Sequence, residues 1–173
     1  AKMINFGLLY GMEAFGLADR LGISRDEAQE QMDAYFDQFV KVKEFMSSVV
    51  TAARNQGYTT TLFGRRRYLP ELKSDNFRIR QMGERMALNA PVQGTSADII
   101  KKAMIDLDAG LRSEGLASTL ILQIHDELIL ECPDEELATA GELVVETMEG
   151  VAGLNVPLKV DLSTGPDLAS VKD

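Results

Sequence analysis

The sequence of 173 residues contains only one cysteine and one histidine, and these absences exclude several kinds of site. The single thiol, Cys132, can form neither an internal disulfide nor a zinc site built from several thiolates. The single histidine, His125, argues against a metal-dependent phosphohydrolase of the His-Asp type, because such sites gather several histidines around the metal.

Long apolar runs are also missing. No uninterrupted apolar stretch approaches the roughly 20 residues of a membrane-spanning helix, and the first residues lack the apolar core of a signal peptide. We therefore expect a cytoplasmic protein. Hydrophobic residues still make up 45% of the chain, so its length is sufficient for one or two small domains with buried cores.

Positive charge is scarce, since the formal net charge is -9, but the charges are unevenly distributed. Residues 65–85 contain seven basic and three acidic side chains, whereas residues 126–149 contain nine acidic side chains and no lysine or arginine. The basic segment predicts a face for a polyanion such as nucleic acid. The acidic segment is either solvated surface or in part a metal site.

The chain begins with helical spacing at residues 1–11 and has no N-cap residue ahead of it, so we expect a piece cut from a larger protein. Lys2, Phe6 and Tyr10 recur every four residues and therefore share one helix face. Such a face can hold a phosphate on the ammonium group and stack a base on the rings. An amphipathic helix with its aromatic rings in the core would show the same spacing.

Two further helical regions are predicted over residues 13–21 and from Ser24 to about residue 56. Ser24 is expected to cap the second region in a capping box with Glu27. Apolar residues continue at helical spacing through residues 28–49, which predicts that they form the core. They are Ala28, Met32, Tyr35, Phe36, Phe39, Val42, Phe45, Met46 and Val49.

Residues 58–62 contain three threonines and one tyrosine, and a turn containing Gly64 follows, which predicts a small hairpin or an extended segment. The next three residues are arginines. Because a guanidinium group matches two phosphate oxygens, Arg65, Arg66 and Arg67 are candidates for contact with a nucleic-acid backbone. A solvated loop would explain the same run of charge.

A long helical pattern covers about residues 76–114, with Pro91 and Gly94 inside it. Proline lacks the amide hydrogen that a helix interior needs. We therefore expect the helix to kink or end at Pro91 and a second segment to begin at Thr95 or Ser96.

Arg85, Asn89 and Gln93 recur every four residues on this helix and share one face. Arginine and amide side chains can read the hydrogen-bond acceptors of the minor groove, which every base pair offers. The face is therefore a candidate for sequence-independent contact with duplex DNA. An exposed polar helix face would have the same spacing.

Two apolar runs on either side of His125-Asp126-Glu127 predict a β-hairpin at about residues 118–132. The stiff tip of a hairpin could present Asp126 to a metal ion or a phosphate, although a polar turn between buried strands is the simpler alternative. Residues 156–162 have the pattern of a last strand. The fold class expected is α+β, with a small antiparallel sheet of hairpin and last strand packed with helices.

Four stretches of the chain resemble, in the right order, motifs of the bacterial DNA polymerase I family, family A. The first matches the pattern Lys-x-x-x-Phe-Gly-x-x-Tyr-Gly of a helix in the fingers subdomain, and the last is His-Asp-Glu between two strands. The resemblance covers nearly the whole chain, to about residue 165. The stretches are residues 2–11, 61–67, 85–95 and 125–127.

The resemblance implies template-directed transfer of a nucleotide from a dNTP to a primer 3′ hydroxyl, the reaction of DNA replication and DNA repair. It implies that Asp126 is one of two carboxylates that hold a pair of Mg²⁺ ions about 4 Å apart. Glu127 would lie just behind that metal ligand, and His125 would touch the primer end.

The same resemblance assigns Lys2 to the triphosphate, where it neutralises charge on the leaving pyrophosphate. Phe6 would pack near the incoming sugar and base, and Tyr10 would guard the templating position. In the family a phenylalanine at position 6 goes with discrimination against dideoxynucleotides, which we expect of the complete enzyme. Primer-template DNA would contact Arg65, Arg66, Arg67, Arg85, Asn89, Gln93 and His125.

Two features depart from the family pattern. The other metal-binding aspartate of the family lies in a motif resembling Asp-Tyr-Ser-Gln-Ile-Glu, and this sequence has no such motif. Asp161, in the predicted last strand, is better explained as an exposed edge residue. The tail, residues 163–173, lacks the tryptophan that is common near the C-terminus of the family.

We therefore expect residues 1–75 to be part of a fingers subdomain and residues 76–173 part of a palm subdomain. The remaining polymerase domain would lie upstream in the parent chain. This chain alone would have little or no nucleotidyl transfer activity. A non-catalytic nucleic-acid-binding module is the alternative.

Overall fold

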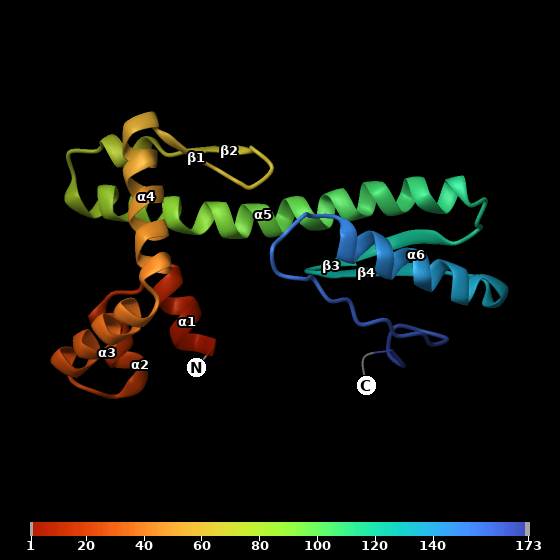
Figure 1. Ribbon diagram of the computed structural model, residues 1–173, viewed down its shortest axis with the longest axis horizontal. Helices are drawn as coiled ribbons and strands as arrows, with labels where there is room; N and C mark the ends of the chain where they lie inside the picture. Colours follow the sequence, from red (N-terminus) through yellow and green to blue (C-terminus); the bar gives the residue numbers. More distant parts are fainter. Residues whose placement is uncertain (1, 172–173) are drawn as a thin grey trace. The chain divides into compact units, whose positions relative to one another are not determined.

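The structure is a computed structural model that describes residues 2–171 and the side chains of residues 4–171. Its contacts divide the chain into two compact units, Ala1–Ser96 and Ala97–Asp173 (Figure 1). The first unit contains α1 (Lys2–Leu9), α2 (Ala14–Leu21), α3 (Arg25–Gln38), α4 (Val40–Gln56), β1 (Tyr58–Thr60), β2 (Arg66–Tyr68), the short 3-10 helix η1 (Pro70–Lys73) and the first part of α5 (Phe77–Ser113). The second unit contains the rest of α5, β3 (Thr119–Ile124), β4 (Glu127–Glu131), the 3-10 helix η2 (Asp134–Glu136) and α6 (Leu137–Gly150).

Local signals in the sequence determine where several helices begin and end. The predicted capping box at the start of α3 is confirmed, because the Glu27 amide donates to Ser24 Oγ at 3.2 Å and the Ser24 amide donates to the Glu27 carboxylate at 2.9 Å. These bonds hold the pKa of Glu27 below its usual value. Helix α2 ends at Gly22 and α4 at Gly57, both in the left-handed conformation that glycine adopts without strain.

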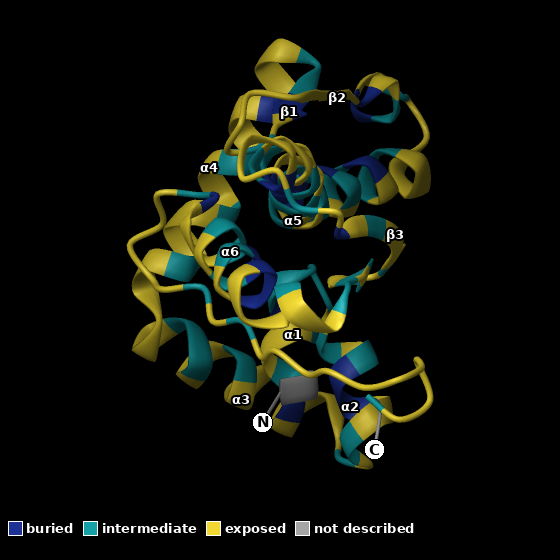
Figure 2. Cartoon of the chain, turned by 90° about the vertical axis from the view of Figure 1, so that its right-hand side faces the viewer, coloured by how far each residue is buried: buried dark blue, intermediate teal, exposed yellow. Residues whose placement is uncertain are grey.

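Buried side chains in the first unit form two clusters. The first joins α1, α2 and α3 through Leu8, Leu17, Ala18 and Ala28, and the second is made of Ala53, Leu69, Leu72 and Ala87. Figure 2 colours such buried residues dark blue, and they are short segments of a chain that is otherwise mostly yellow or teal.

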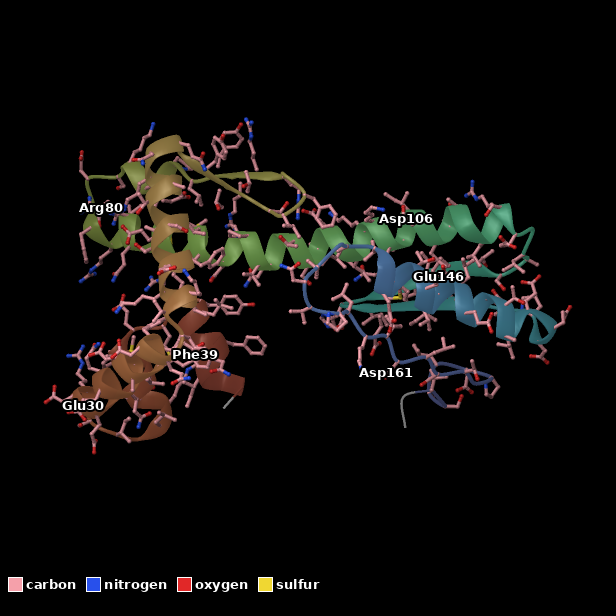
Figure 3. All side chains as sticks on the ribbon, viewed as in Figure 1. Glu30, Phe39, Arg80, Asp106, Glu146 and Asp161 are labelled. Carbon is pink, nitrogen blue, oxygen red and sulfur yellow. The ribbon has the colours of Figure 1, made fainter. Side chains whose placement is uncertain are left out.

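The core prediction for residues 28–49 is only partly correct. Ala28 is buried, and Met32, Tyr35 and Phe36 pack against the first cluster, but Phe39 is 48% exposed and Phe45 41% exposed. Phe39, labelled in Figure 3, lies between α3 and α4, where its backbone leaves the helical conformation with ψ at 57°. A helical period that continues across this break no longer marks a single buried face.

Helix α5 does not end at Pro91, so the expectation that a helix ends there and that a second one starts at Thr95 or Ser96 is wrong. Ala87, Leu88 and Ala90, on the turn before the proline, are buried. Their packing offsets the hydrogen bond that the proline cannot donate. The Thr95 hydroxyl, one turn later, donates to the Pro91 carbonyl.

The hairpin predicted near residue 60 is confirmed as the antiparallel pair β1 and β2, in which Tyr58 faces Tyr68 and Thr60 faces Arg66. The Thr61 amide donates to the Arg65 carbonyl at 2.9 Å and closes the loop between the strands. This hairpin belongs to the first unit, together with the part of α5 that precedes Ala97.

The hairpin predicted at about residues 118–132 is confirmed as β3 and β4, an antiparallel pair in which Ile124 faces Glu127. Side chains of α5 and α6 form the core of this unit, and Leu128 and Leu130 of β4 pack against it. The core residues are Leu107, Leu111, Ala140 and Val144. The α+β class is therefore confirmed, as helices with two small antiparallel sheets.

The strand predicted at residues 156–162 is wrong, because none of the described residues after α6 belongs to a strand. The Val160 amide donates instead to the Glu149 carboxylate of α6, at 3.0 Å. Asp161, labelled in Figure 3, lies on this irregular segment; it is exposed and is not a strand residue. Within residues 2–171, no helix has the length and apolar character needed to cross a membrane.

A carboxylate on η2 fixes the start of β3. Glu136 accepts hydrogen bonds from the Ala117 amide at 2.8 Å, the Ser118 amide at 2.9 Å and the Ser118 hydroxyl at 2.6 Å. The bond from the Ser118 hydroxyl, followed by that from the Ala117 amide, holds the pKa of Glu136 below its usual value of 4.5. The folded chain therefore binds a proton at Glu136 less readily than the unfolded chain does.

We expect Glu136→Gln to lower the melting temperature of the chain at pH 7. The contribution of the charged group is complete above about pH 4.5 and is lost as the pH falls through the lower pKa of the folded state. The melting temperatures of the variant and the parent should therefore converge in acid, which circular dichroism from pH 7 to pH 3 can measure. Glu135→Gln removes the same charge from the neighbouring exposed position and is the control. Equal melting temperatures for the two variants at pH 7 would contradict this role of Glu136.

Candidate functional site

Helix α1 presents two aromatic rings on one face, as the spacing of Phe6 and Tyr10 predicts. Their ring centroids are 6.2 Å apart and their planes differ by 12°, so the rings are stacked. Phe6 is 47% exposed and Tyr10 is half-buried, so the rings are accessible and not enclosed in the core. The core side of α1 is formed by Leu8, which is 1% exposed. The alternative in which these aromatics are core residues is wrong for Phe6.

Gly11 brings the end of α1 close to α5. Its φ of 79° is a conformation that favours glycine, and a Cβ added there would lie 3.2 Å from Leu88 Cδ1 and 3.4 Å from Arg85 Cγ. Two residues later there is a second contact with α5, in which Gln81 donates a hydrogen bond to the Glu13 carboxylate. A residue with a Cβ at position 11 would be strained by its positive φ and would lie close to both side chains, so glycine suits the approach of α1 to Arg85.

A pocket of about 550 Å³ opens between α1, α2 and α5 within the first unit. It brings together Phe6, Tyr10 and Arg85, three candidates from two separate sequence motifs. It also includes Phe15 and Arg20 of α2, which the sequence patterns did not single out. The lining residues are Phe6, Gly7, Tyr10, Gly11, Met12, Glu13, Phe15, Gly16, Arg20 and Arg85.

The α2 wall of this pocket combines aromatic and cationic groups. The Phe15 ring is 63% exposed, and the Arg25 guanidinium carbon lies 5.0 Å from its centroid. Aromatic faces beside guanidinium groups suit the bases and phosphates of a nucleic-acid strand. Leu17 and Ala18 of α2 are buried, but a helical pattern in the sequence cannot distinguish an exposed aromatic ring such as Phe15 from one that packs in the core.

The polar stripe on α5 is present as predicted, because residues 85–93 lie on one continuous helix. Arg85 and Gln93 are exposed, and Asn89 is half-buried. The Asn89 side-chain oxygen is buried and accepts no hydrogen bond from any residue that the structure describes. Such an acceptor is a candidate to bind a donor that comes from another molecule.

The three arginines after Gly64 differ in their surroundings. The Arg65 guanidinium donates to the Gly94 carbonyl of α5 at 2.9 Å. The guanidinium carbon of Arg66 lies 4.7 Å from the Tyr58 ring centroid, and a hydrogen bond with Tyr68 raises the pKa of Arg66. Arg67 is exposed on β2. The run of three arginines alone could not distinguish these surroundings, because they depend on partners outside it, such as Gly94 for Arg65 and Tyr58 for Arg66.

In the second unit, His125 and Asp126 form the two-residue turn between β3 and β4 and are exposed. His125 has a φ of 56°, the only positive value at a non-glycine residue in the described chain. A positive φ costs about 1 kcal/mol or more for a residue with a Cβ. Gln123 donates a hydrogen bond to the His125 carbonyl and braces this strained turn.

The chemistry of the turn suits a hard divalent cation, because Asp126 offers carboxylate oxygens to solvent with Glu127 beside it. Among residues 2–171, no group of three histidine, cysteine, aspartate or glutamate side chains lies close enough to hold a metal ion. Asp126 therefore fits as one ligand of a site and not as a site by itself. Lys2 belongs to α1, but its side chain lies outside the described residues.

Comparison with known proteins assigns the family. The family model described as "DNA polymerase family A" matches residues 1–170. The chain belongs to DNA polymerase family A.

Family A relatives are similar to this chain over nearly its whole length. It is 54% identical over 165 residues to DNA polymerase I of Bacillus caldotenax, which covers 95% of this chain and 19% of the relative. It is 51% identical over 172 residues to DNA polymerase I of Bacillus subtilis, which covers 99% of this chain and 20% of the relative. The chain thus spans about a fifth of the length of these curated family A relatives.

A solved structure has the same fold. The polymerase domain of Pol1 from M. smegmatis, in complex with DNA primer-template and dNTP, matches with a TM-score of 0.88 and 49% sequence identity. The match covers 91% of this chain and 28% of that chain. The resemblance to family A that the four sequence motifs indicate is therefore confirmed.

Proposed function

We propose that this chain is part of a DNA-dependent DNA polymerase and forms one portion of its nucleotidyl transfer site. The observation that supports this most strongly is the pocket that gathers Phe6, Tyr10 and Arg85 from two family A motifs. The Pol1 domain with the same fold binds primer-template and dNTP, which are the ligands that the pocket chemistry suits. The assignment of residues 1–75 to the fingers and 76–173 to the palm remains a prediction.

In this proposal, α1 binds the incoming nucleotide. Phe6 packs against its sugar and base, while Tyr10, one turn later, occupies the templating position until a template base replaces its ring. Lys2 lies one turn before Phe6 on the same helix face and holds the triphosphate. Its positive charge offsets the negative charge that builds up on the departing pyrophosphate.

In the same proposal, the polar residues of α5 and the arginines of the β1–β2 hairpin bind primer-template DNA. Arg85, Asn89 and Gln93 contact the minor groove, where every base pair offers acceptors. The exposed side chain of Arg67 and the tyrosine-stacked side chain of Arg66 lie on β2 and contact phosphates. His125 touches the primer end, for which its place at an exposed turn is suitable.

Asp126 is the residue of this chain that would hold the catalytic metal ions, with Glu127 supporting it. When bound, two Mg²⁺ ions would stabilise charge on the attacking and leaving oxygens. The primer 3′ oxygen gives its proton to water and forms a bond to the α-phosphorus, while the bond from that phosphorus to the pyrophosphate oxygen breaks and pyrophosphate leaves with the electron pair. Asp126 suits this role because a braced hairpin turn holds its backbone in place before the ions bind.

Primer extension tests the proposal. A "grafted polymerase", in which this chain replaces the aligned part of the Bacillus caldotenax enzyme, should extend a primer with the nucleotide that the template directs. The isolated chain should not do so at a comparable rate, since this sequence lacks the motif that carries the second aspartate. Gel analysis of a labelled primer measures both. A grafted polymerase that binds DNA but does not extend the primer would favour the binding-module alternative.

A further inference from the structure

We propose that Arg65 is a positioning residue, which holds the loop between β1 and β2 against α5 and thereby orients Gln93 for DNA. In this proposal Arg65 does not itself bind a phosphate. The inference rests on the proposed function and changes one part of it. The sequence alone places Arg65, Arg66 and Arg67 together as phosphate contacts, whereas their surroundings in the structure differ.

The first observation is the bond from the Arg65 guanidinium to the Gly94 carbonyl, at 2.9 Å. A guanidinium group has its donors in a fixed plane, so a bond to a helix carbonyl also limits the directions in which the remaining donors can point. This carbonyl belongs to the residue directly after Gln93. The contact therefore restrains the backbone that carries Gln93.

The second observation is that the loop also contacts α5 at Thr95 and lies close to Gly94, while a hydrogen bond within the loop holds Thr61 against Arg65. The Leu62 amide donates to Thr95 Oγ1 at 2.9 Å, and the Arg65 amide donates to Thr61 Oγ1 at 3.1 Å. A Cβ added at Gly94 would lie only 2.6 Å from Thr61 Cγ2. Glycine at position 94 is thus what allows the loop to approach α5 so closely.

The third observation is that this turn of α5 is intrinsically weak. Pro91 donates no backbone hydrogen bond, and glycine within a helix is less stable than alanine by about 1 kcal/mol. The loop supplies hydrogen bonds to this turn, at Gly94 and Thr95. Removing the Arg65 contact should therefore loosen the helix where the Arg85, Asn89 and Gln93 stripe ends.

Salt dependence separates a positioning residue from a phosphate contact. In the grafted polymerase, Arg67→Met should lower the slope of log affinity for primer-template against log salt by about 0.9, the value for one lost phosphate contact. Arg65→Met should leave this slope unchanged and weaken binding of primer-template by about 2- to 30-fold. That is the range of effects for residues that alter binding without contacting the ligand. An equal loss of slope in the two variants would overturn the proposal.

A double-mutant cycle adds a second criterion. If Arg65 acts through Gln93, then Arg65→Met should weaken binding little in a protein that already carries Gln93→Ala. Thr95→Val removes the acceptor for the Leu62 amide at nearly equal volume, and it too should weaken binding little when Gln93→Ala is already present. This variant replaces Arg65→Met in the test if Arg65→Met fails to fold. Full additivity of both variants with Gln93→Ala would overturn the proposal.

Hydrogen exchange without DNA tests this role of Arg65 independently of the proposed function. Exchange at the Leu62 amide should be faster in Arg65→Met than in the parent protein and unchanged in Arg67→Met. If Arg67→Met and Gln93→Ala leave DNA binding intact, the proposed function fails, but the exchange rate at Leu62 still tests whether Arg65 holds the loop on α5. Unchanged exchange at Leu62 in Arg65→Met would overturn that role of Arg65.

Discussion

Asp126→Asn in the grafted polymerase should reduce the rate of primer extension by about 10³-fold while primer-template affinity changes less than about twofold. Charge stabilisation by bound metal ions contributes several kcal/mol to such reactions, and about 4 kcal/mol corresponds to that factor in rate. The asparagine keeps the size and the turn preference of the aspartate, so β3 and β4 should still pair as they do now. Single-turnover extension and a separate DNA-binding titration measure the two quantities.

Glu131→Gln is the matched control for this experiment. Glu131 is an exposed carboxylate at the other end of β4, so the substitution removes the same charge from the same strand. It should leave the rate within about twofold of the parent, since surface substitutions away from a site have small effects. If Asp126→Asn kept more than a tenth of the parent rate, Asp126 would not be a metal ligand. The binding-module alternative would then gain support.

Features that depend on neighbouring residues in the chain could be predicted from the sequence. Ser24 and Glu27 form their capping box because both partners lie within one helical turn. The β3–β4 hairpin follows from two apolar runs around a polar turn, since the strands pair with each other and need no distant partner. The stacking of Phe6 on Tyr10 likewise follows from four-residue spacing on one helix.

Predictions that depend on distant residues were less successful. Whether α5 continues through Pro91 depends on the burial of Ala87 and Leu88 and on the loop seated at Gly94, none of which a helix propensity contains. Residues 156–162 have a strand-like pattern, but a strand also needs a neighbour with free backbone groups. The Val160 amide donates to Glu149 of α6 instead.

The candidate site shows the same division. Phe6, Tyr10 and Arg85 could be selected by their spacing, but only the close approach at Gly11 shows that they line one pocket. Phe15 and Arg20 were missed because an exposed aromatic ring and a surface arginine have no distinguishing local pattern. The distinct surroundings of Arg65, Arg66 and Arg67 also depend on contacts outside the motif.

Phe6→Tyr should make the grafted polymerase accept dideoxynucleotides far more readily, with the incorporation ratio of ddNTP to dNTP rising by about 10- to 100-fold. A dideoxynucleotide lacks the 3′ hydroxyl, and the added phenol could replace its hydrogen bond to the charged triphosphate. A hydrogen bond to a charged group contributes about 1.5–3 kcal/mol, which corresponds to a factor of this size.

The structure explains why the added hydroxyl should be tolerated at position 6 and why its effect should be specific. Phe6 is half-exposed and lines the pocket, so position 6 is not part of a closely packed core that an added oxygen would overfill. Tyr10→Phe removes a hydroxyl from the ring stacked on Phe6 and is the control, because it alters the same aromatic pair without adding a donor at position 6. Competition between labelled ddNTP and dNTP at a single template position measures the ratio. An unchanged ratio in Phe6→Tyr, or an equal rise in Tyr10→Phe, would place the sugar of the incoming nucleotide away from Phe6.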